Sequence, residues 1–338
     1  MTIVQHVPLS VLDLAVVPEG ATSTAALADT TRLALRAEAL GYTRFWVAEH
    51  HNMPNIASTT PPVLIAHLAA ATTKIRVGSG GVMLPNHPAL VVAEQFALLE
   101  ALHPGRIDLG IGRAPGTDPV TAAALRRTAA GLGVEDFPRH LLDLMGLLGD
   151  RRGATGLWNR FAATPAAATT PTIVLLGSSG YSAQLAGQLG LPFAFAHHFD
   201  TGGTLQALAL YHQNFTPSPV LAQPYAIVTA AVLTAATDEE AAWFAAPAQL
   251  MTLALRSGRL VPLLSPELAA THPDLAMARQ MPSNRIIGAP ATVVAELEAL
   301  VQETAANEVM VFTFTHGLEE RIRSLELLAA AWQTGSAD

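Results

Sequence analysis

Short apolar runs alternate along this chain with segments whose apolar residues recur at helical spacing. An uninterrupted run such as Phe45-Trp46-Val47-Ala48 indicates a strand buried on both faces, typical of a parallel sheet covered by helices. The strands are expected at 8–17, 45–48, 75–81, 107–112, 172–176, 193–196, 225–233 and 309–314. The helices are expected at 24–40, 61–71, 90–102, 120–130, 138–148, 182–189, 204–215, 238–256, 290–304 and 318–332.

This alternation continues without a composition shift that would mark a domain boundary. It predicts one α/β domain over residues 1–338, folded as a closed (β/α)8 TIM barrel. An open, doubly wound parallel sheet is the alternative. The stretch at about 260–286, which carries several prolines and scattered polar residues, is expected to form a loop or lid inserted into the barrel.

Charge and composition exclude several classes of partner. The net charge is −8 and Lys74 is the only lysine, so we expect neither a nucleic-acid nor a membrane-surface partner. The chain has no cysteine, which excludes disulfides and thiolate chemistry. Residues 161–237 carry a single formal charge, but prolines and glycines break them into runs shorter than the roughly 20 residues a membrane helix needs. No export signal opens the chain, and a cytoplasmic protein is expected.

The strand at 45–48 ends in polar residues suited to proton transfer, Glu49-His50-His51-Asn52. In parallel α/β folds the chemistry lies at the carboxyl ends of the strands, so His50 is a candidate proton donor. The alternative is that the histidines only cap a loop.

Two further strand ends carry candidate binding residues. Gly80-Gly81 would expose backbone against which a flat ring could lie, with a β-bulge as the alternative. Arg113 follows the fourth strand, where a guanidinium could meet a phosphate or an anionic ring. The glycines around Gly112 do not form a dinucleotide fingerprint, because their spacing is too long and no acidic residue follows a second strand.

The fifth strand runs into a turn of small and hydroxyl residues that precedes a helix. Free backbone N–H groups at a helix N-terminus attract anions, so this turn predicts an anion site, with an ordinary serine cap as the alternative. It is neither a Walker loop nor a nucleophile elbow. Its candidate residues are Gly177, Ser178, Ser179, Tyr181 and Ser182.

A second histidine pair, His197-His198, follows the sixth strand. Together with His50 and His51 it could suggest a metal. Adjacent residues at a strand end tend to point apart, however, and no metal-ligand spacing is present, so no metal site is expected.

Four motifs in order carry a resemblance to a known family: FWVAEHHN, IRVGSGGVMLPNHP, ALHPGRIDLGIGRAPG and LLGSSGYSAQLAGQLGLPFAFAHHF. They resemble the bacterial luciferase-like flavin monooxygenases, most closely the short-chain members that are not luciferases. The resemblance covers nearly the whole chain, since 287–290 and 308–314 also match the ending of that family.

The resemblance implies a barrel that binds reduced FMN at the carboxyl ends of its strands. It implies His50 as the catalytic residue and a non-prolyl cis peptide at Gly80-Gly81 under the flavin ring. It also implies flavin contact for Arg113 and phosphate contact for Arg139 and for Ser178, with Tyr181 or Ser182 nearby. Gly112 stands where the luciferase catalytic subunit has a reactive cysteine, which argues against light emission.

The implied reaction uses reduced FMN and O2, through a C4a-hydroperoxyflavin, to oxygenate a small organic substrate. The missing dinucleotide fingerprint implies that a separate flavin reductase supplies reduced FMN. Two rivals are hydride transfer with F420 and a non-catalytic flavin-binding paralogue. The helices expected at 61–71 and 90–102 are apolar nearly all round, so a homodimer is expected.

Overall fold

The computed structural model describes residues 6–125, 136–199, 202–259 and 261–334. Eight parallel strands form a closed ring in the order β1-β2-β3-β4-β5-β6-β7-β9, with β9 pairing back to β1. The ring confirms the TIM barrel and excludes the open sheet. Its strands are β1 (Leu9–Asp13), β2 (Arg44–Val47), β3 (Arg76–Met83), β4 (Ile107–Gly112), β5 (Thr172–Gly177), β6 (Phe193–Phe195), β7 (Ala226–Thr234) and β9 (Glu308–Phe312).

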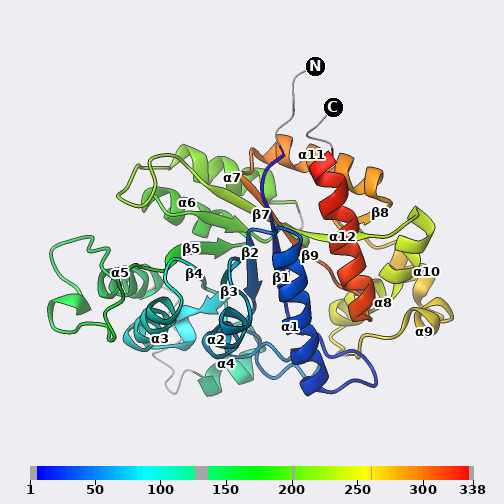
Figure 1. The fold of residues 1–338 in the computed structure, drawn as a ribbon, viewed down its shortest axis with the longest axis horizontal. Helices are drawn as coiled ribbons and strands as arrows, with labels where there is room; N and C mark the ends of the chain where they lie inside the picture. The colour runs from blue at the N-terminus through cyan, green and yellow to red at the C-terminus, as the bar shows by residue number, and fades with distance from the viewer. Residues whose placement is uncertain (1–5, 126–135, 200–201, 260, 335–338) are drawn as a thin grey trace.

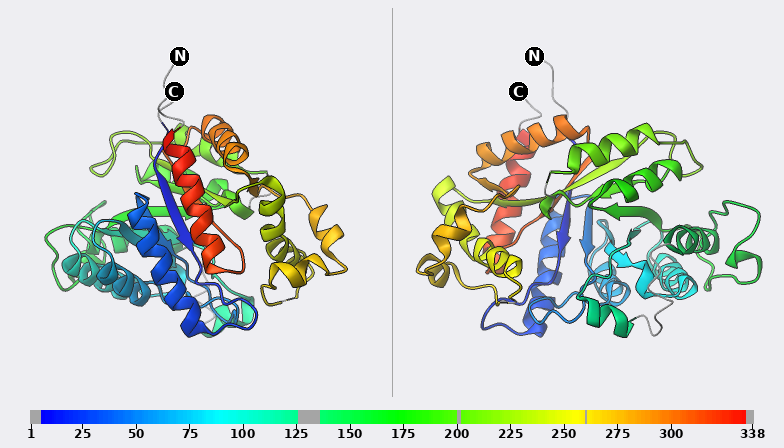
Figure 2. Two further views of the ribbon diagram at one scale, coloured as in Figure 1. Left: turned by 45° about the vertical axis from the view of Figure 1, so that its right-hand side comes forward. Right: turned by 180° about the vertical axis from the view of Figure 1, so that it is seen from behind.

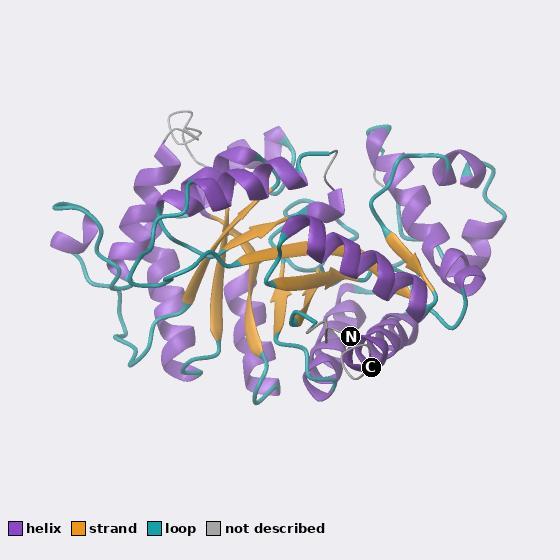
Figure 3. Ribbon diagram, turned by 90° about the horizontal axis from the view of Figure 1, so that it is seen from above, coloured by secondary structure: helices purple, strands orange, loops and turns teal. Residues whose placement is uncertain are grey.

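Helices surround the ring on its outside (Figures 1 and 3). They are α1 (Ser23–Ala39), α2 (Pro61–Ala71), α3 (Ala89–Leu102), α4 (Pro119–Leu125), α5 (Phe137–Leu147), α6 (Gly180–Gln188), α7 (Thr204–Gln213), α8 (Asp238–Arg256), α11 (Pro290–Thr304) and α12 (Leu318–Thr334). The helix expected at 120–130 is seen as α4 up to Leu125, and its remainder lies outside the described residues. Within the described ranges, no helix is long and apolar enough to cross a membrane.

The segment expected as a loop or lid contains two short helices, α9 (Pro266–Ala270) and α10 (Leu275–Arg279). They pack on α8, where Leu275 joins Leu250 in a small apolar cluster, and the group stands to one side of the ring (Figure 2). A ninth strand, β8 (Ile286–Gly288), follows and pairs with the carboxyl end of β7. The sequence did not predict β8.

Alternating side chains build two apolar layers. Phe45, Val77 and Phe193 belong to the large cluster between the strands and the surrounding helices. Trp46 and Ile227 belong to a second cluster. Phe45 and Trp46 are neighbours on β2 and both fully buried, so this strand is covered on both faces, as its unbroken apolar run predicts.

Paired charges occupy the amino ends of the strands. Arg44, the first residue of β2, forms ion pairs with two fully buried carboxylates, at 2.9 Å to Asp108 and 2.9 Å to Glu308. Arg76 binds the other oxygen of Asp108 at 2.6 Å. Because these carboxylates are satisfied by pairing, this end of the barrel has a structural role. The candidate site residues lie at the opposite end, where the strands have their carboxyl ends.

Candidate active site at the carboxyl ends of the strands

The buried carboxylate of Glu49 joins the loop after β2 to the loop after β3. Its Oε1 accepts hydrogen bonds from His51 Nε2 (2.9 Å), His87 Nε2 (2.9 Å) and Asn86 Nδ2 (3.1 Å), and Oε2 accepts from the Met83 backbone N–H (2.9 Å). Burial raises the pKa of Glu49, but the hydrogen bonds from His87, His51 and Met83 outweigh this and the pKa is lowered. Glu49 is therefore an anion that fixes both loops.

His50 lies between these loops. Its Nδ1 is 3.2 Å from the carbonyl oxygen of Gly116, in the loop after β4. Burial lowers the pKa of His50, although the Gly116 carbonyl and the Glu49 charge oppose this. The ring is therefore neutral at pH 7. Because a carbonyl can only accept, Nδ1 carries the proton and Nε2 keeps a lone pair.

Gly116 permits the close approach that this contact needs. Its φ is +68°, and a Cβ there would lie 2.7 Å from the Glu49 carbonyl oxygen. A side chain at this position would push the loop after β4 away from His50.

The Gly80-Gly81 bond is cis, as the resemblance implies. The register of β3 against β4 also shifts between Gly80 and Val82, so the bulge that the sequence left as an alternative is present too. A Cβ on Gly81 would lie 2.7 Å from the carbonyl oxygen of Gly110, so only glycine fits there. A Cβ on Gly80 would lie 2.7 Å from the end of the Leu12 side chain, which would have to move.

The serine turn lies where β5 ends and α6 begins. Gly177 is the last residue of β5, Ser178 and Ser179 are exposed, and Ser179 caps α6 without a side-chain hydrogen bond to the helix. The two exposed hydroxyls and the free N–H groups of α6 are therefore available to an anion. Ser182, by contrast, is buried inside the first turn of α6, where it packs against Gly177.

Arg113 reaches this turn from the neighbouring strand. Its guanidinium carbon lies 4.1 Å from the ring centroid of Tyr181. Among the described residues no carboxylate lies within ion-pair distance of Arg113, so its charge is available to a ligand. Arg139 lies on α5, where its exposed guanidinium pairs with Asp136 at 3.3 Å. The phosphate contact of Arg139 stays a prediction.

The structure brings together three of the predicted groups. His50, Arg113 and the serine turn follow or end β2, β4 and β5, and Gly80-Gly81 lies in the second half of β3. The carboxyl ends of these parallel strands lie at one end of the ring. This end of the barrel is called the mouth below. It faces downward in Figure 1, where α4 lies.

Sequence reasoning missed several residues near the mouth. Asn86 and His87 had no assigned role, although they lie in the motif VMLPNHP that carries the resemblance. His198 is half-buried, with Nδ1 3.4 Å from the Thr229 carbonyl oxygen, and desolvation lowers its pKa to about 4. The charges of His197, Arg285 and His50 lower it further. The described residues contain no group of three or more potential metal ligands.

Comparisons with known proteins place the chain in a family. Residues 7–308 match the model described as luciferase-like monooxygenase. The Bacillus subtilis (strain 168) protein YvbT is 46% identical over 96% of this chain and 96% of its own. A luciferase-like monooxygenase of Escherichia coli (strain K12) is 42% identical over 95% and 96%. The N-acetyl-S-alkylcysteine monooxygenase of Bacillus subtilis (strain 168) is 36% identical over 96% and 97%.

Solved structures share the fold. Apo-MsnO8 superposes with a TM-score of 0.87 at 36% identity and covers 97% of this chain and 98% of its own. The oxygenating constituent of 3,6-diketocamphane monooxygenase from Pseudomonas putida, in complex with FMN, gives 0.72 at 18% identity, with 98% of each chain covered. An F420-dependent secondary alcohol dehydrogenase gives 0.67 at 14% identity, covering 97% and 99%. At these low identities the last two show the fold alone. The family model matches most of this chain, and several relatives are more than 30% identical over nearly all of it. The chain therefore belongs to the luciferase-like monooxygenases, a family of oxidoreductase enzymes.

Proposed function

We propose that the protein is a flavin-dependent monooxygenase that uses reduced FMN and O2 to oxygenate a small organic substrate. The observation that carries the proposal is the shared mouth, where an open anion site after β4 and β5 and a neutral imidazole after β2 lie at the same end of the ring. The names of relatives that are more than 30% identical point the same way, since several of them are named monooxygenases.

The residues of the mouth fit a flavin phosphate. The exposed hydroxyls of Ser178 and Ser179, the N-terminus of α6 and the guanidinium of Arg113 form an anion site with three kinds of donor. The ring of Tyr181 packs against the guanidinium of Arg113. Because Gly177 has no Cβ, the buried side chain of Ser182 has room at the end of β5. Reduced flavin, when bound, supplies the electrons that activate O2.

The protein itself handles the proton. With Nδ1 of His50 donating to Gly116, the lone pair on Nε2 can accept a proton and return it during turnover. Glu49 is bound by His51, Asn86 and His87 and therefore keeps the loop that carries His50 in place. The apolar lining of the barrel excludes water from the reaction.

Two partners belong to the proposal. A separate reductase supplies reduced FMN, because the sequence has no dinucleotide fingerprint. A second copy of the chain covers α2 and α3, which lie side by side and expose Val63, Val91, Leu98 and Leu102.

F420-dependent hydride transfer is the second candidate, since a dehydrogenase that uses F420 has the same fold. One titration separates the two. Under anaerobic conditions the protein is titrated with reduced FMN and with reduced F420, and each complex is then mixed with oxygenated buffer while the absorbance spectrum and oxygen uptake are followed. The proposal expects tighter binding of reduced FMN and oxygen consumption that rises with added substrate. Preferential binding of F420, or bound reduced FMN that consumes no oxygen with any substrate, would contradict it.

A further inference from the structure

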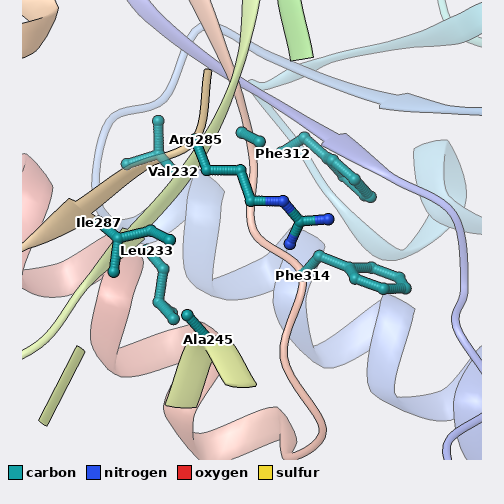
Figure 4. A pocket seen from close by; sticks show the side chains of 8 residues that line it. Val232, Leu233, Ala245, Arg285, Ile287, Phe312 and Phe314 are labelled. Atoms are coloured by element: carbon teal, nitrogen blue, oxygen red, sulfur yellow. The ribbon is translucent and has the colours of Figure 1, made fainter. Parts of the chain in front are cut away.

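A guanidinium without an acidic partner lies beside the mouth, outside the anion site described above. It belongs to Arg285, which immediately precedes β8, and it points toward the rings of Phe312 and Phe314 (Figure 4). The other residues that line this pocket are apolar: Ala231, Val232, Leu233, Ala245 and Ile287.

The hydrogen bonds of Arg285 use only one end of the guanidinium. Nη2 donates to Thr252 Oγ1 at 2.7 Å and to the Ala248 carbonyl oxygen at 3.2 Å, both on α8. Within the described part of the chain, Nη1 and Nε have no hydrogen-bond partner and no carboxylate lies within ion-pair distance. Burial lowers the pKa of Arg285 to about 10, so the group is still a cation at neutral pH.

Two other arginines whose side chains are little exposed are paired with carboxylates. Arg321 binds Asp13 at 2.9 Å, and Arg44 binds Asp108 at the same distance. Part-buried Arg106 has no carboxylate partner, but its Nε, Nη1 and Nη2 all donate to carbonyl or hydroxyl oxygens, as expected of an arginine that supports the fold. Arg285 is also part-buried and uses Nη2 alone, so its remaining N–H groups point to a ligand.

The position of Arg285 is fixed relative to the mouth. Asn284 donates from Nδ2 to the His197 carbonyl oxygen at 2.6 Å, which ties the segment before β8 to the end of β6. Phe312, beside the guanidinium, also contacts His198, with 5.5 Å between the ring centroids. The pocket therefore lies next to His198, on the side of β7 and β9 and not on the side of the serine turn.

We propose that Arg285 binds a carboxylate of the substrate, whose apolar body packs against Phe312 and Phe314. The free N–H groups of Nη1 can donate a charge-assisted hydrogen bond to a carboxylate oxygen. The apolar lining leaves the remainder of such a ligand dry and selects against a strongly hydrated anion such as phosphate. The role in substrate choice rests on the proposed function, but the binding of a carboxylate does not.

The test is therefore a binding experiment without flavin. Hexanoate, its neutral analogue hexanamide and inorganic phosphate are titrated into the protein by calorimetry. The variants are Arg285→Gln, Arg285→Lys and, as a matched control, Arg279→Gln, which changes an exposed arginine of α10. Circular dichroism checks that each variant is folded.

The inference expects hexanoate to bind at least tenfold more tightly than hexanamide or phosphate. Arg285→Gln should remove this preference, Arg285→Lys should retain part of it, and Arg279→Gln should leave it unchanged. Equal binding of hexanoate and hexanamide to the unaltered protein would overturn the inference, as would an unchanged preference in a folded Arg285→Gln. If Arg285→Gln instead weakened reduced FMN tenfold, the guanidinium would belong to the cofactor site. None of these outcomes depends on oxygen uptake, so the proposed function is judged separately.

Discussion

Arg113, which follows β4, lies over the ring of Tyr181 at the start of α6, with 4.1 Å between the guanidinium carbon and the ring centroid. The contact joins two neighbouring strand ends and holds a cation beside the exposed serines of the turn. Flavin binding in this account depends on that arrangement.

Replacing Arg113 by Met should weaken reduced FMN about 10- to 100-fold, because the phosphate loses one charge-assisted contact. Anaerobic fluorescence titration measures the change. Arg160→Met, which alters an exposed arginine on the long connection before β5, is the control and should bind normally. Arg139→Met tests the second predicted phosphate contact, and only a comparable loss there would support that role.

Replacing His50 by Ala should leave reduced FMN affinity nearly intact and lower kcat about 10²- to 10⁴-fold, since proton transfer at Nε2 is lost. Steady-state oxygen uptake and product formation give kcat once a substrate is known. His67→Ala, on the exposed face of α2, should behave like the unaltered enzyme. Unchanged turnover in His50→Ala would remove His50 from the mechanism.

Replacing Glu49 by Gln should destabilise the protein by about 2–4 kcal/mol at pH 7, because a buried anion that accepts four hydrogen bonds becomes an amide. The folded pKa of Glu49 is lowered, so its contribution is present above the ordinary value of 4.5 and is lost as the pH falls through the folded pKa. Urea unfolding at pH 7 and below pH 4 measures both effects. The exposed Glu19→Gln is the control. Equal stability of Glu49→Gln and the unaltered protein at pH 7 would show that the carboxylate is not required.

His198 should make the protein less stable in mild acid. Its pKa is about 4 when folded and 6.5 ordinarily, so the unfolded chain binds more protons between these values. Stability should therefore fall by up to about 3 kcal/mol as the pH drops from 6.5 to 4. His198→Asn should flatten this part of the curve, measured by urea unfolding across the range. A curve of the same slope in the variant would assign the effect to other groups.

The paired substitution Leu98→Glu and Leu102→Glu should yield monomers. These side chains, 49% and 60% exposed on α3, would place two charges in the proposed interface between copies. Light scattering at micromolar concentration measures the molecular mass. Val120→Glu, which changes an exposed side chain on α4, is the control and should leave a dimer intact. A monomer from the unaltered chain would refute the expected interface.

The eight barrel strands could be located because they are largely buried on both faces and therefore read as mainly apolar runs. The residues at which the strands end could not be predicted. The first strand was expected to continue to residue 17, but it stops at Asp13, whose carboxylate accepts from the Ala15 N–H and the Thr30 hydroxyl. Ala15 has a φ of +50°, so the chain turns away. β8 was missed because three residues that pair only with the end of β7 give no periodic signal.

The residues of the site likewise fall into those that could be predicted from the sequence and those that could not. His50, Gly80-Gly81 and the serine turn could be placed together because the carboxyl ends of parallel strands share one end of a barrel. Residues that act through partners distant in the sequence could not be predicted. His87 reaches Glu49, 38 positions away, and Arg285 reaches Thr252, 33 positions away, and nothing local in the sequence shows either contact.

The preference for FMN over riboflavin tests the central claim most directly, since the two differ only in the phosphate that the serine turn and Arg113 are proposed to hold. Anaerobic titration with each reduced flavin gives two dissociation constants for the unaltered protein and for Arg113→Met. The account predicts that FMN binds at least tenfold more tightly than riboflavin and that Arg113→Met removes most of this difference. Equal affinities for the two flavins in the unaltered protein would contradict it.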